Sequence, residues 1–326
     1  MGRRHMQVVL DSGLELVGVV DADPAALDLP AEIPIPRERR FTDLDQALGL
    51  RPDCVIVATT ATSHAGYTCR AAEAGARFIL CEKPMATSLA DCDRMIESCR
   101  IHGARLAINH QMRFMEQYTT ARQITSGEAF GGLASVLVAA GNFGMAMNGT
   151  HYFEMFRYLS GEPPASVSAW FSPSSVPNPR GPQYEDRAGS ARVTTASGKR
   201  LYLEVGDDQG HGVTVLYSGR HGQLLIDEMH GEARLSVREE QYRELPTTRY
   251  AMPAVRESWA IRPADALEPT RAVLQALLAG EDVPTGEDGR SAVATLIAAY
   301  ISSENGGLVV EVVDGNLPED RVFPWA

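Results

Sequence analysis

Three short apolar runs, each followed by a segment of helical length, most constrain what this chain can fold into. The runs span residues 53–58, 77–81 and 105–109, and a β-branched run at residues 14–20 precedes them. A strand that is apolar along its whole length is typical of a sheet covered on both faces. Strands that alternate with helices of ~10–15 residues indicate βαβ units. The sequence therefore predicts an α/β domain with a parallel sheet over residues 1–112.

A different pattern begins after residue 112. Residues 133–140 are typical of a strand, and residues 167–237 contain many short strand-like runs with hairpin signals between them. Such runs indicate an antiparallel sheet. Apolar helical segments precede and follow these runs. We expect residues 113–326 to form a second, α+β domain with a large, mainly antiparallel sheet.

The composition excludes several kinds of partner. The net charge of −12, from 42 acidic and 30 basic residues, argues against nucleic acid and anionic membrane surfaces as partners. No segment reaches the ~18 apolar residues that a membrane-spanning helix needs. The cysteines lack C-x-x-C spacing, which predicts a reduced, cytoplasmic protein without a metal site. They are Cys54, Cys69, Cys81, Cys92 and Cys99.

A lysine follows the second apolar run, in the sequence Glu82-Lys83-Pro84. In open parallel sheets, ligands bind at the carboxyl ends of the strands. Pro84 disfavours the α region for the residue before it, so the next helix, expected to begin near Ser88, cannot absorb Lys83. A strand-end lysine before proline has no evident structural task. We therefore expect Lys83 to project into a cleft.

Two further residues, His151 and Asp21, stand at positions where a function is expected. His151 opens an apolar helix, and a histidine together with a lysine suggests chemistry on a hydroxyl or carbonyl group. A histidine that simply packs in its helix is the alternative. Asp21 ends the run at residues 14–20, where the acidic residue of a dinucleotide-binding fold binds the ribose hydroxyls. Because a carboxylate repels a 2′-phosphate, Asp21 favours NAD over NADP, although a turn beside Asp23 would also explain it.

Several short motifs together point to one known family. Glu82-Lys83-Pro84, in its strand-to-helix setting, is the most specific of them. The others are Val20-Asp21-Ala22-Asp23-Pro24, Ala58-Thr59-Thr60 with His64, Gly149-Thr150-His151, and Pro284-Thr285-Gly286-Glu287-Asp288-Gly289-Arg290. Spread over nearly the whole chain, they resemble the Gfo/Idh/MocA family of sugar and inositol dehydrogenases.

The resemblance implies a fold, a reaction and an assembly. The fold is a Rossmann domain followed by an α+β domain whose open sheet forms substrate and oligomer contacts. The reaction is hydride transfer between a nicotinamide cofactor, NAD rather than NADP, and a carbon of a sugar, inositol or related polyol. An open antiparallel sheet usually has a covering partner, so we expect a homodimer or homotetramer.

The resemblance also implies roles for individual residues. Lys83 would hydrogen-bond the reacting oxygen and stabilise its developing negative charge. His151 would take the hydroxyl proton as general base. Cofactor contacts are expected from Asp21, Thr59, Thr60, His64, Glu82 and Lys83, with Glu82 on the nicotinamide side. Substrate contacts are expected from Gln111, Arg113 and Asn148. His64 begins a helix, so a surface position at its amino-terminal end is the alternative.

The sequence departs from the family pattern at two places. The family's first strand and G-x-G-x-x-G turn are represented only by their end, with Gly2 in the place of the last glycine. Because that turn binds the pyrophosphate, we expect weak NAD binding unless the native chain starts ~15–25 residues earlier. The family's Asp four residues before the histidine is Met147 here, and Met cannot orient an imidazole.

These observations leave three hypotheses. The first is an NAD-dependent oxidoreductase acting on a sugar, inositol or related polyol. The second is a redox-assisted lyase or glycosidase, which would oxidise a sugar carbon transiently and produce no net NADH. The third is a non-catalytic or cofactor-impaired binding protein on the same fold, which the incomplete phosphate turn and Met147 favour.

Overall fold

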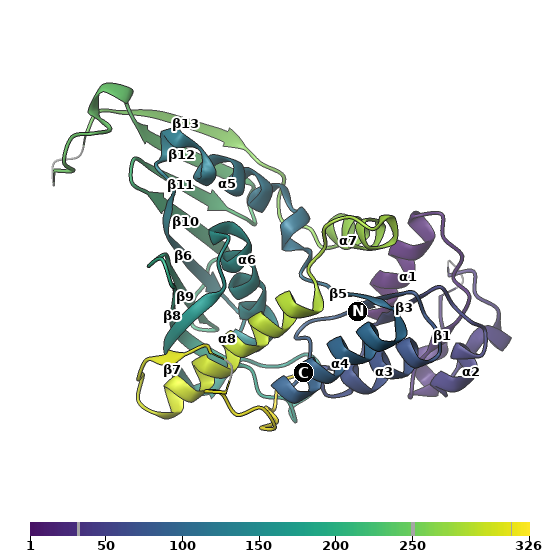
Figure 1. Ribbon diagram of the computed structural model, residues 1–326. Helices are drawn as coiled ribbons and strands as arrows, with labels where there is room; N and C mark the ends of the chain where they lie inside the picture. Colours follow the sequence, from purple (N-terminus) through teal and green to yellow (C-terminus); the bar gives the residue numbers. More distant parts are fainter. Residues whose placement is uncertain (31–32, 249–251, 314) are drawn as a thin grey trace. The chain divides into compact units, whose positions relative to one another are not determined.

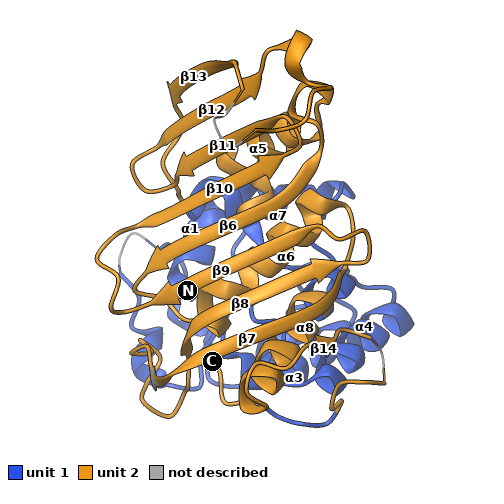
Figure 2. Ribbon diagram, turned by 90° about the vertical axis from the view of Figure 1, so that its left-hand side faces the viewer, with its two compact units in different colours: residues 1–111, 266–290, 320–322 blue, residues 112–265, 291–319, 323–326 orange. Residues whose placement is uncertain are grey.

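The chain divides into two compact units in the computed structural model, which describes residues 1–30, 33–248, 252–313 and 315–326. Unit 1 comprises residues 1–111, 266–290 and 320–322, and unit 2 comprises residues 112–265, 291–319 and 323–326 (Figure 2). The first segment of unit 1 ends one residue from the boundary predicted at residue 112. Residues 266–290 then return to unit 1, a return that the predicted division did not include.

The predicted parallel sheet of unit 1 is confirmed, and it is built in two parts. Strands β3 (Cys54–Val57), β4 (Phe78–Cys81) and β5 (Arg105–Ile108) pair in parallel in that order. Strands β1 (Val19–Val20) and β2 (Arg40–Phe41) form a separate parallel pair. The strand predicted at residues 14–20 is therefore paired only at its last two residues, because its partner is equally short.

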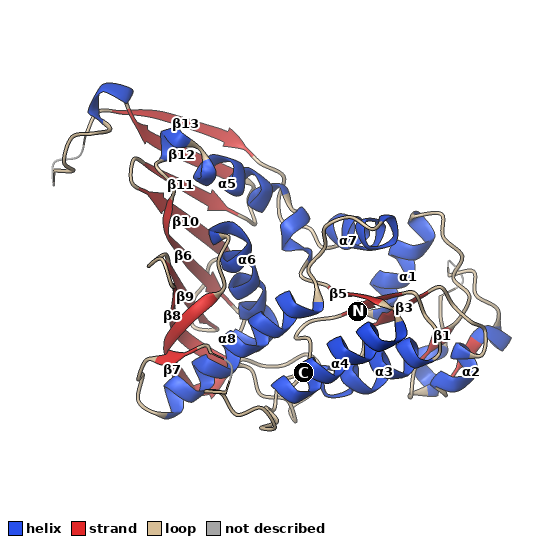
Figure 3. Ribbon diagram, in the orientation of Figure 1, coloured by secondary structure: helices blue, strands red, loops and turns tan. Residues whose placement is uncertain are grey.

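Helices cover both faces of the three-stranded sheet. Helices α3 (Ala61–Glu73) and α4 (Leu89–His102) lie on one face, and α1 (Gly2–Asp11) and α7 (Leu267–Ala279) lie on the other (Figure 3). This cover explains why β4 is buried along most of its length. The short helix α2 (Leu44–Leu48) follows β2. The sequence analysis did not predict α1.

The start of α4 follows its sequence signal and fixes where Lys83 lies. The Ser88 hydroxyl accepts a hydrogen bond of 3.2 Å from the Asp91 backbone N–H, which caps the helix. Gly103, at φ 70°, ends the helix in the left-handed region. Since the helix begins at Leu89, Lys83 stays in the loop between β4 and α4.

Unit 2 contains a nine-stranded sheet in the order β13-β12-β11-β10-β6-β9-β8-β7-β14 (Figure 2). Every neighbouring pair is antiparallel except β6 and β9, so the predicted, mainly antiparallel sheet is confirmed. The strands are β6 (Leu133–Gly141), β7 (Pro164–Ser175), β8 (Arg187–Thr195), β9 (Arg200–Gly206), β10 (Val213–Gly219), β11 (Gly222–Asp227), β12 (Glu232–Arg238), β13 (Ala254–Ala260) and β14 (Val310–Glu311).

One face of the nine-stranded sheet is covered within unit 2, and the other is open. Helices α5 (Glu116–Ser126), α6 (Thr150–Ser160) and the unit 2 part of α8 (Gly286–Glu304) lie on the covered face (Figure 1). Val136, Val138 and Val215 on this face are buried, whereas the alternate positions Leu137, Tyr202 and Trp170 are 41%, 39% and 56% exposed. Leu137 and Tyr202 are direct cross-strand partners. The open sheet that the family resemblance implies is therefore present.

A glycine in this sheet has a conformation that other residues rarely adopt. Gly189 of β8 has a φ of 134°, and a Cβ atom there would overlap the Trp170 carbonyl oxygen. Replacement by alanine would add backbone strain and a steric clash. We expect Gly189→Ala to lower the free energy of unfolding by about 2 kcal/mol or more, measured by chemical denaturation. Gly210→Ala is the control, since nothing lies within 4 Å of its Cβ position; equal stability of the two variants would contradict the prediction.

Candidate active site

The carboxyl ends of β3, β4 and β5 bring together most residues predicted to contact the cofactor. Thr59 and Thr60 follow β3, at the amino-terminal end of α3, while Glu82 and Lys83 follow β4. Gln111 follows β5. Because parallel strands end at the same edge of a sheet, these side chains lie in the position where such sheets bind ligands. Asp21 follows β1, is exposed, and accepts a hydrogen bond of 3.0 Å from the Asp23 backbone N–H.

Lys83 is unusual in this chain because the chain contains almost no lysine. Of the 30 basic residues, 28 are arginines, and the lysines are Lys83 and Lys199. Lys199 has a structural explanation, since its ammonium donates to the Ser160 carbonyl and pairs with Glu162 at 2.7 Å. Lys83 is 9% exposed and joined to Pro84 by a cis peptide bond. Lysine, with its compact ammonium group, stands at this strand end although nearly all other basic residues of the chain are arginines. The scarcity of lysine is a signal that the predictions from sequence did not use.

The Glu82 carboxylate is buried and bound by protein groups. It is 1% exposed, and it accepts hydrogen bonds from His5 Nε2 at 2.7 Å and from the Asn109 amide at 2.9 Å. Burial alone would raise the pKa of Glu82. The hydrogen bond and charge of His5, the charge of Lys83 and the Asn109 amide outweigh it and hold the pKa well below its usual range.

His64 lies in the interior rather than at the surface. Its ring is fully buried, with Nδ1 at 3.0 Å from the Pro84 carbonyl oxygen and Nε2 at 3.3 Å from that of Thr59. Burial lowers the pKa of His64, opposed by the Glu82 charge and by these carbonyl groups. The surface alternative is wrong, and the ring links the loop after Lys83 to the start of α3. The cofactor contact of His64 stays a prediction.

Gln111 presents an unsatisfied amide oxygen. The residue is 9% exposed, and its Oε1 atom has no hydrogen-bond partner among the described residues. A buried polar atom without a partner costs about 1–3 kcal/mol, so such atoms are often found where a ligand binds. This arrangement agrees with the substrate contact expected for Gln111.

In unit 2, His151 lies in the first turn of α6 and is 7% exposed. A single π-helical turn, η5 (Met145–Gly149), precedes it and contains Met147 and Asn148. The Asp186 carboxylate accepts hydrogen bonds from the backbone N–H groups of Ala146 at 2.8 Å and Met147 at 3.3 Å. Asp186 thus holds the turn that leads to His151. The sequence analysis missed it because Asp186 lies 40 residues from Ala146 and carries no local motif.

Arg113 is committed to an ion pair within unit 2. Its Nε donates to Glu154 Oε1 at 2.7 Å, and its guanidinium lies over the Tyr158 ring, 5.0 Å from the centroid. Arg113 and Glu154 are 7% and 1% exposed. A substrate contact through Arg113, as predicted from the sequence, would have to be made by a guanidinium that already binds Glu154.

A second buried carboxylate, Glu228, ties α5 and α6 to the sheet. It accepts hydrogen bonds from the hydroxyl groups of Tyr118 on α5 and Tyr152 on α6. Burial raises the pKa of Glu228 to about 7, although the two hydroxyl donors lower it. The carboxyl group fixes the helix that carries His151. No local sequence signal marks this cluster, because its members are far apart along the chain.

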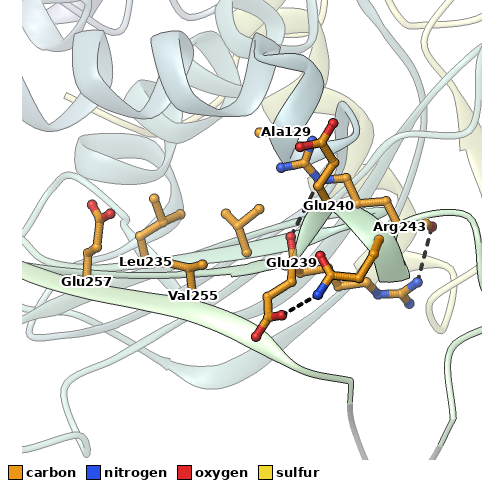
Figure 4. Close-up of a pocket in the computed structure, with 10 residues that line it drawn as sticks. Ala129, Leu235, Glu239, Glu240, Arg243, Val255 and Glu257 are labelled. Carbon is orange, nitrogen blue, oxygen red and sulfur yellow. Dashed lines mark hydrogen bonds between the residues drawn. The ribbon is translucent and has the colours of Figure 1, made fainter.

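A hollow of about 510 Å³ lies in unit 2, away from all of these residues. Figure 4 shows its lining, which comes from β12, β13 and the turns beside them and includes Glu239, Glu240 and Arg243. Within the lining, the Gln241 amide donates to Glu239. None of the residues predicted as functional lines this hollow, so it does not bear on the chemistry.

Two kinds of feature are absent from the part of the chain that the structure describes. Among the described residues, no group of three or more His, Cys, Asp or Glu side chains could hold a metal ion. Within the same residues, no helix is both long enough and apolar enough to cross a membrane. The polar groups at the strand ends, a lysine, two threonines and an aspartate, are of the kinds that bind a dinucleotide and a hydroxylated substrate.

The fold and these residues define a class: a dinucleotide-binding α/β unit joined to a unit with a large open sheet. The model of the Gfo/Idh/MocA family, described as an oxidoreductase family with an NAD-binding Rossmann fold, matches residues 1–110. The resemblance inferred from the sequence is therefore confirmed: residues 1–110 belong to this NAD-binding oxidoreductase family.

Relatives and solved structures extend the similarity over the whole chain. A D-apiose dehydrogenase from Paraburkholderia graminis is 26% identical, over 94% of this chain and 86% of the relative. A 2,7-anhydro-N-acetylneuraminate hydratase from Mediterraneibacter gnavus is 38% identical, but over 28% of this chain and 24% of its own length. The structure of GenD2 from gentamicin A biosynthesis, in complex with NAD, is 25% identical with a TM-score of 0.75, over 95% of this chain and 93% of that chain.

The Glu228 carboxyl should make the stability of the protein depend on pH. Its pKa is about 7 in the folded protein against 4.5 as the ordinary value, so the folded state binds the proton more tightly. The resulting stabilisation is present below pH 4.5 and is lost as the pH rises through 7. Relative to Glu228→Gln, the free energy of unfolding of the native protein should fall by about 3 kcal/mol across this interval, measured by denaturant titration.

The exposed Glu257 of β13 offers a control for this measurement. Relative to Glu257→Gln, the free energy of unfolding should show no comparable pH dependence, because this carboxyl is exposed to water rather than buried. If the difference in free energy of unfolding between the native protein and Glu228→Gln did not change with pH, the buried carboxyl would not be protonated in this range.

Proposed function

We propose that the protein is an NAD-dependent oxidoreductase that moves hydride between the cofactor and a carbon of a sugar, inositol or related polyol. The observation that carries the proposal is Lys83, one of two lysines in the chain, held after β4 beside a buried carboxylate. Membership of residues 1–110 in an NAD-binding oxidoreductase family and the similarity to a D-apiose dehydrogenase support it. When bound, the nicotinamide supplies the hydride acceptor or donor.

The proposed chemistry assigns one task to each of two side chains. The Lys83 ammonium donates a hydrogen bond to the reacting oxygen and stabilises the negative charge that develops as the C–H bond breaks. His151 takes the hydroxyl proton as general base in oxidation and returns it in reduction. Asp186 holds the turn before His151, in which Met147 stands at the position of the family's Asp.

The remaining assignments follow the sequence predictions. We assign the adenine ribose to Asp21, and the rest of the cofactor to Thr59, Thr60, His64 and Glu82. The exposure of Asp21 and the strand-end positions of the two threonines support this assignment. Substrate contacts are assigned to Gln111, Asn148 and Arg113, of which Gln111 has the best structural support through its unsatisfied oxygen.

The proposal extends to assembly and location. The open sheet face, with exposed Leu137, Trp170 and Tyr202, suits contact with a second copy of the chain in a homodimer or homotetramer. All five cysteines are free thiols, in agreement with a reduced, cytoplasmic location.

A second candidate is a redox-neutral reaction, in which the hydride returns to the same substrate after an elimination or addition step. The similarity of a 92-residue segment to a 2,7-anhydro-N-acetylneuraminate hydratase favours keeping it. The two candidates differ in one observable. A net oxidoreductase accumulates NADH with a polyol, whereas a redox-neutral enzyme converts its substrate without a net change in absorbance at the NADH wavelength.

Replacement of Lys83 tests the leading proposal. Lys83→Ala should lower kcat/KM for the best cyclitol or aldose by ~10²-fold or more, since it removes the charge that stabilises the transition state. Lys199→Arg is the control and should keep full activity, because Lys199 makes only structural contacts with Ser160 and Glu162. Folded protein with bound NAD that turns over no member of a broad polyol panel would refute the proposed activity.

Replacement of Asp21 tests the choice of cofactor. Asp21→Asn removes a negative charge from the end of β1 and should shift the ratio of the Kd values for NAD and NADP by about tenfold toward NADP. Asp28→Asn removes the same charge from an exposed site seven positions later and should leave the ratio unchanged. Calorimetric titration with both cofactors measures the ratio, and an unchanged preference in Asp21→Asn would assign Asp21 to the turn alone.

A further inference from the structure

Helix α1 contributes a histidine to the buried carboxylate next to Lys83. His5 is 3% exposed, and its Nε2 lies 2.7 Å from Glu82 Oε1. The proposed chemistry gives His5 no contact with the reacting atoms, and the sequence analysis gave it no role. A buried histidine that binds a buried carboxylate 77 residues away is nevertheless costly unless the charges are matched.

Two separate elements converge on the Glu82 carboxylate, and the next residue of its own loop lies close to it as well. His5 reaches it from α1, Asn109 reaches it from the end of β5, and the Lys83 backbone N–H lies 3.3 Å from its Oε2. The Asn109 amide lies in turn 3.4 Å from the Thr270 hydroxyl on α7. These contacts fix the carboxylate next to the backbone of Lys83, the residue that carries the proposed chemistry.

Among the described residues, His5 and Lys83 are the neighbours whose charges favour an ionised Glu82. The other titratable groups that face it are Cys81 and His64. Burial raises the pKa of the Cys81 thiol and lowers the pKa of the His64 imidazole, so both are neutral near pH 7. The negative charge of an ionised Glu82 therefore acts on both the His5 ring, which it binds directly, and the side chain of the adjacent Lys83.

We propose that His5 is a positioning residue that acts through Glu82: it keeps the carboxylate ionised, and the carboxylate keeps the Lys83 ammonium protonated. Loss of His5 removes the donor nearest to the carboxylate and favours uptake of a proton by Glu82. The negative charge beside Lys83 is then lost, and a largely buried ammonium gives up its proton more easily. The consequence for catalysis rests on the proposed function, whereas the coupling of charges does not.

The near absence of lysine makes this coupling directly measurable. In a protein labelled with ¹³C-lysine, the Lys199→Arg variant contains a single lysine, so the side-chain NMR signal reports on Lys83 alone. Titration of that signal with pH gives the midpoint at which Lys83 loses its proton. Lys199 belongs to unit 2, where its ammonium donates to the Ser160 carbonyl and the Glu162 carboxylate.

Four substitutions in the Lys199→Arg background test the proposal. Glu82→Gln should lower the Lys83 midpoint by about one pH unit or more, and His5→Gln and Asn109→Ala should lower it in the same direction. Glu97→Gln, which removes an exposed carboxylate paired with Arg100 on α4, is the matched control and should leave it unchanged. Should Glu82→Gln fail to fold, as judged by circular dichroism, the His5 and Asn109 variants carry the test.

The outcomes separate the parts of the proposal. An unchanged Lys83 midpoint in folded Glu82→Gln, or in both folded His5→Gln and Asn109→Ala, overturns the coupling. If Glu82→Gln shifts the Lys83 midpoint but His5→Gln does not, His5 plays no part in the coupling. Where turnover is measurable, His5→Gln should move the alkaline limb of the kcat/KM profile to lower pH. If no polyol is turned over, the proposed function fails, and the lysine titration still decides this inference.

Discussion

A carboxylate removed from water must be matched by donors, and this requirement organises the interior of both units. Glu82 and Glu228 are equally buried but have different partners. Glu82 is bound by a histidine and an amide beside a lysine, and its pKa is low. Glu228 is bound by tyrosine hydroxyls, and its pKa is raised to about 7. A glutamate thus carries a permanent charge in unit 1, as Glu82, whereas in unit 2 Glu228 links two helices to the sheet through a carboxyl group that can titrate.

The proposed catalytic side chains are held by backbone that is itself fixed at both ends. Lys83 lies between a fully paired strand, β4, and a helix whose start is capped by Ser88. His151 lies between a turn held by Asp186 and a helix tied down through Tyr152. In each case the supporting groups are buried, which restricts the motion of the residue that they present. Rigid placement of this kind is what hydride transfer requires of its acid–base groups.

The sequence predicted the features that local signals encode. The apolar runs located β3, β4 and β5, and Ser88 with Asp91 located the start of α4. The residues of the site that follow these strands were predicted for the same reason. The partners that support the site could not be predicted, because His5 and Glu82, Asp186 and Met147, and Tyr118 and Glu228 are each brought together by tertiary packing over 39 to 110 residues. The ion pair of Arg113 could not be predicted either, because its partner Glu154 belongs to another helix.

The parallel pairing of β6 with β9 has a consequence for the order in which the chain can fold. β6 lies in the middle of its sheet, yet both of its partners, β9 and β10, come long after it in the sequence. During synthesis β6 must remain unpaired until β9, at residues 200–206, has left the ribosome, and it is paired on both sides only after residue 219, although the strands of unit 1 can pair as soon as each is made. Unit 1 must in turn wait for α7, which comes after all the strands of unit 2 except β14. A nascent chain of this protein therefore carries exposed apolar strands for most of its synthesis, and these are the segments that chaperones would have to protect.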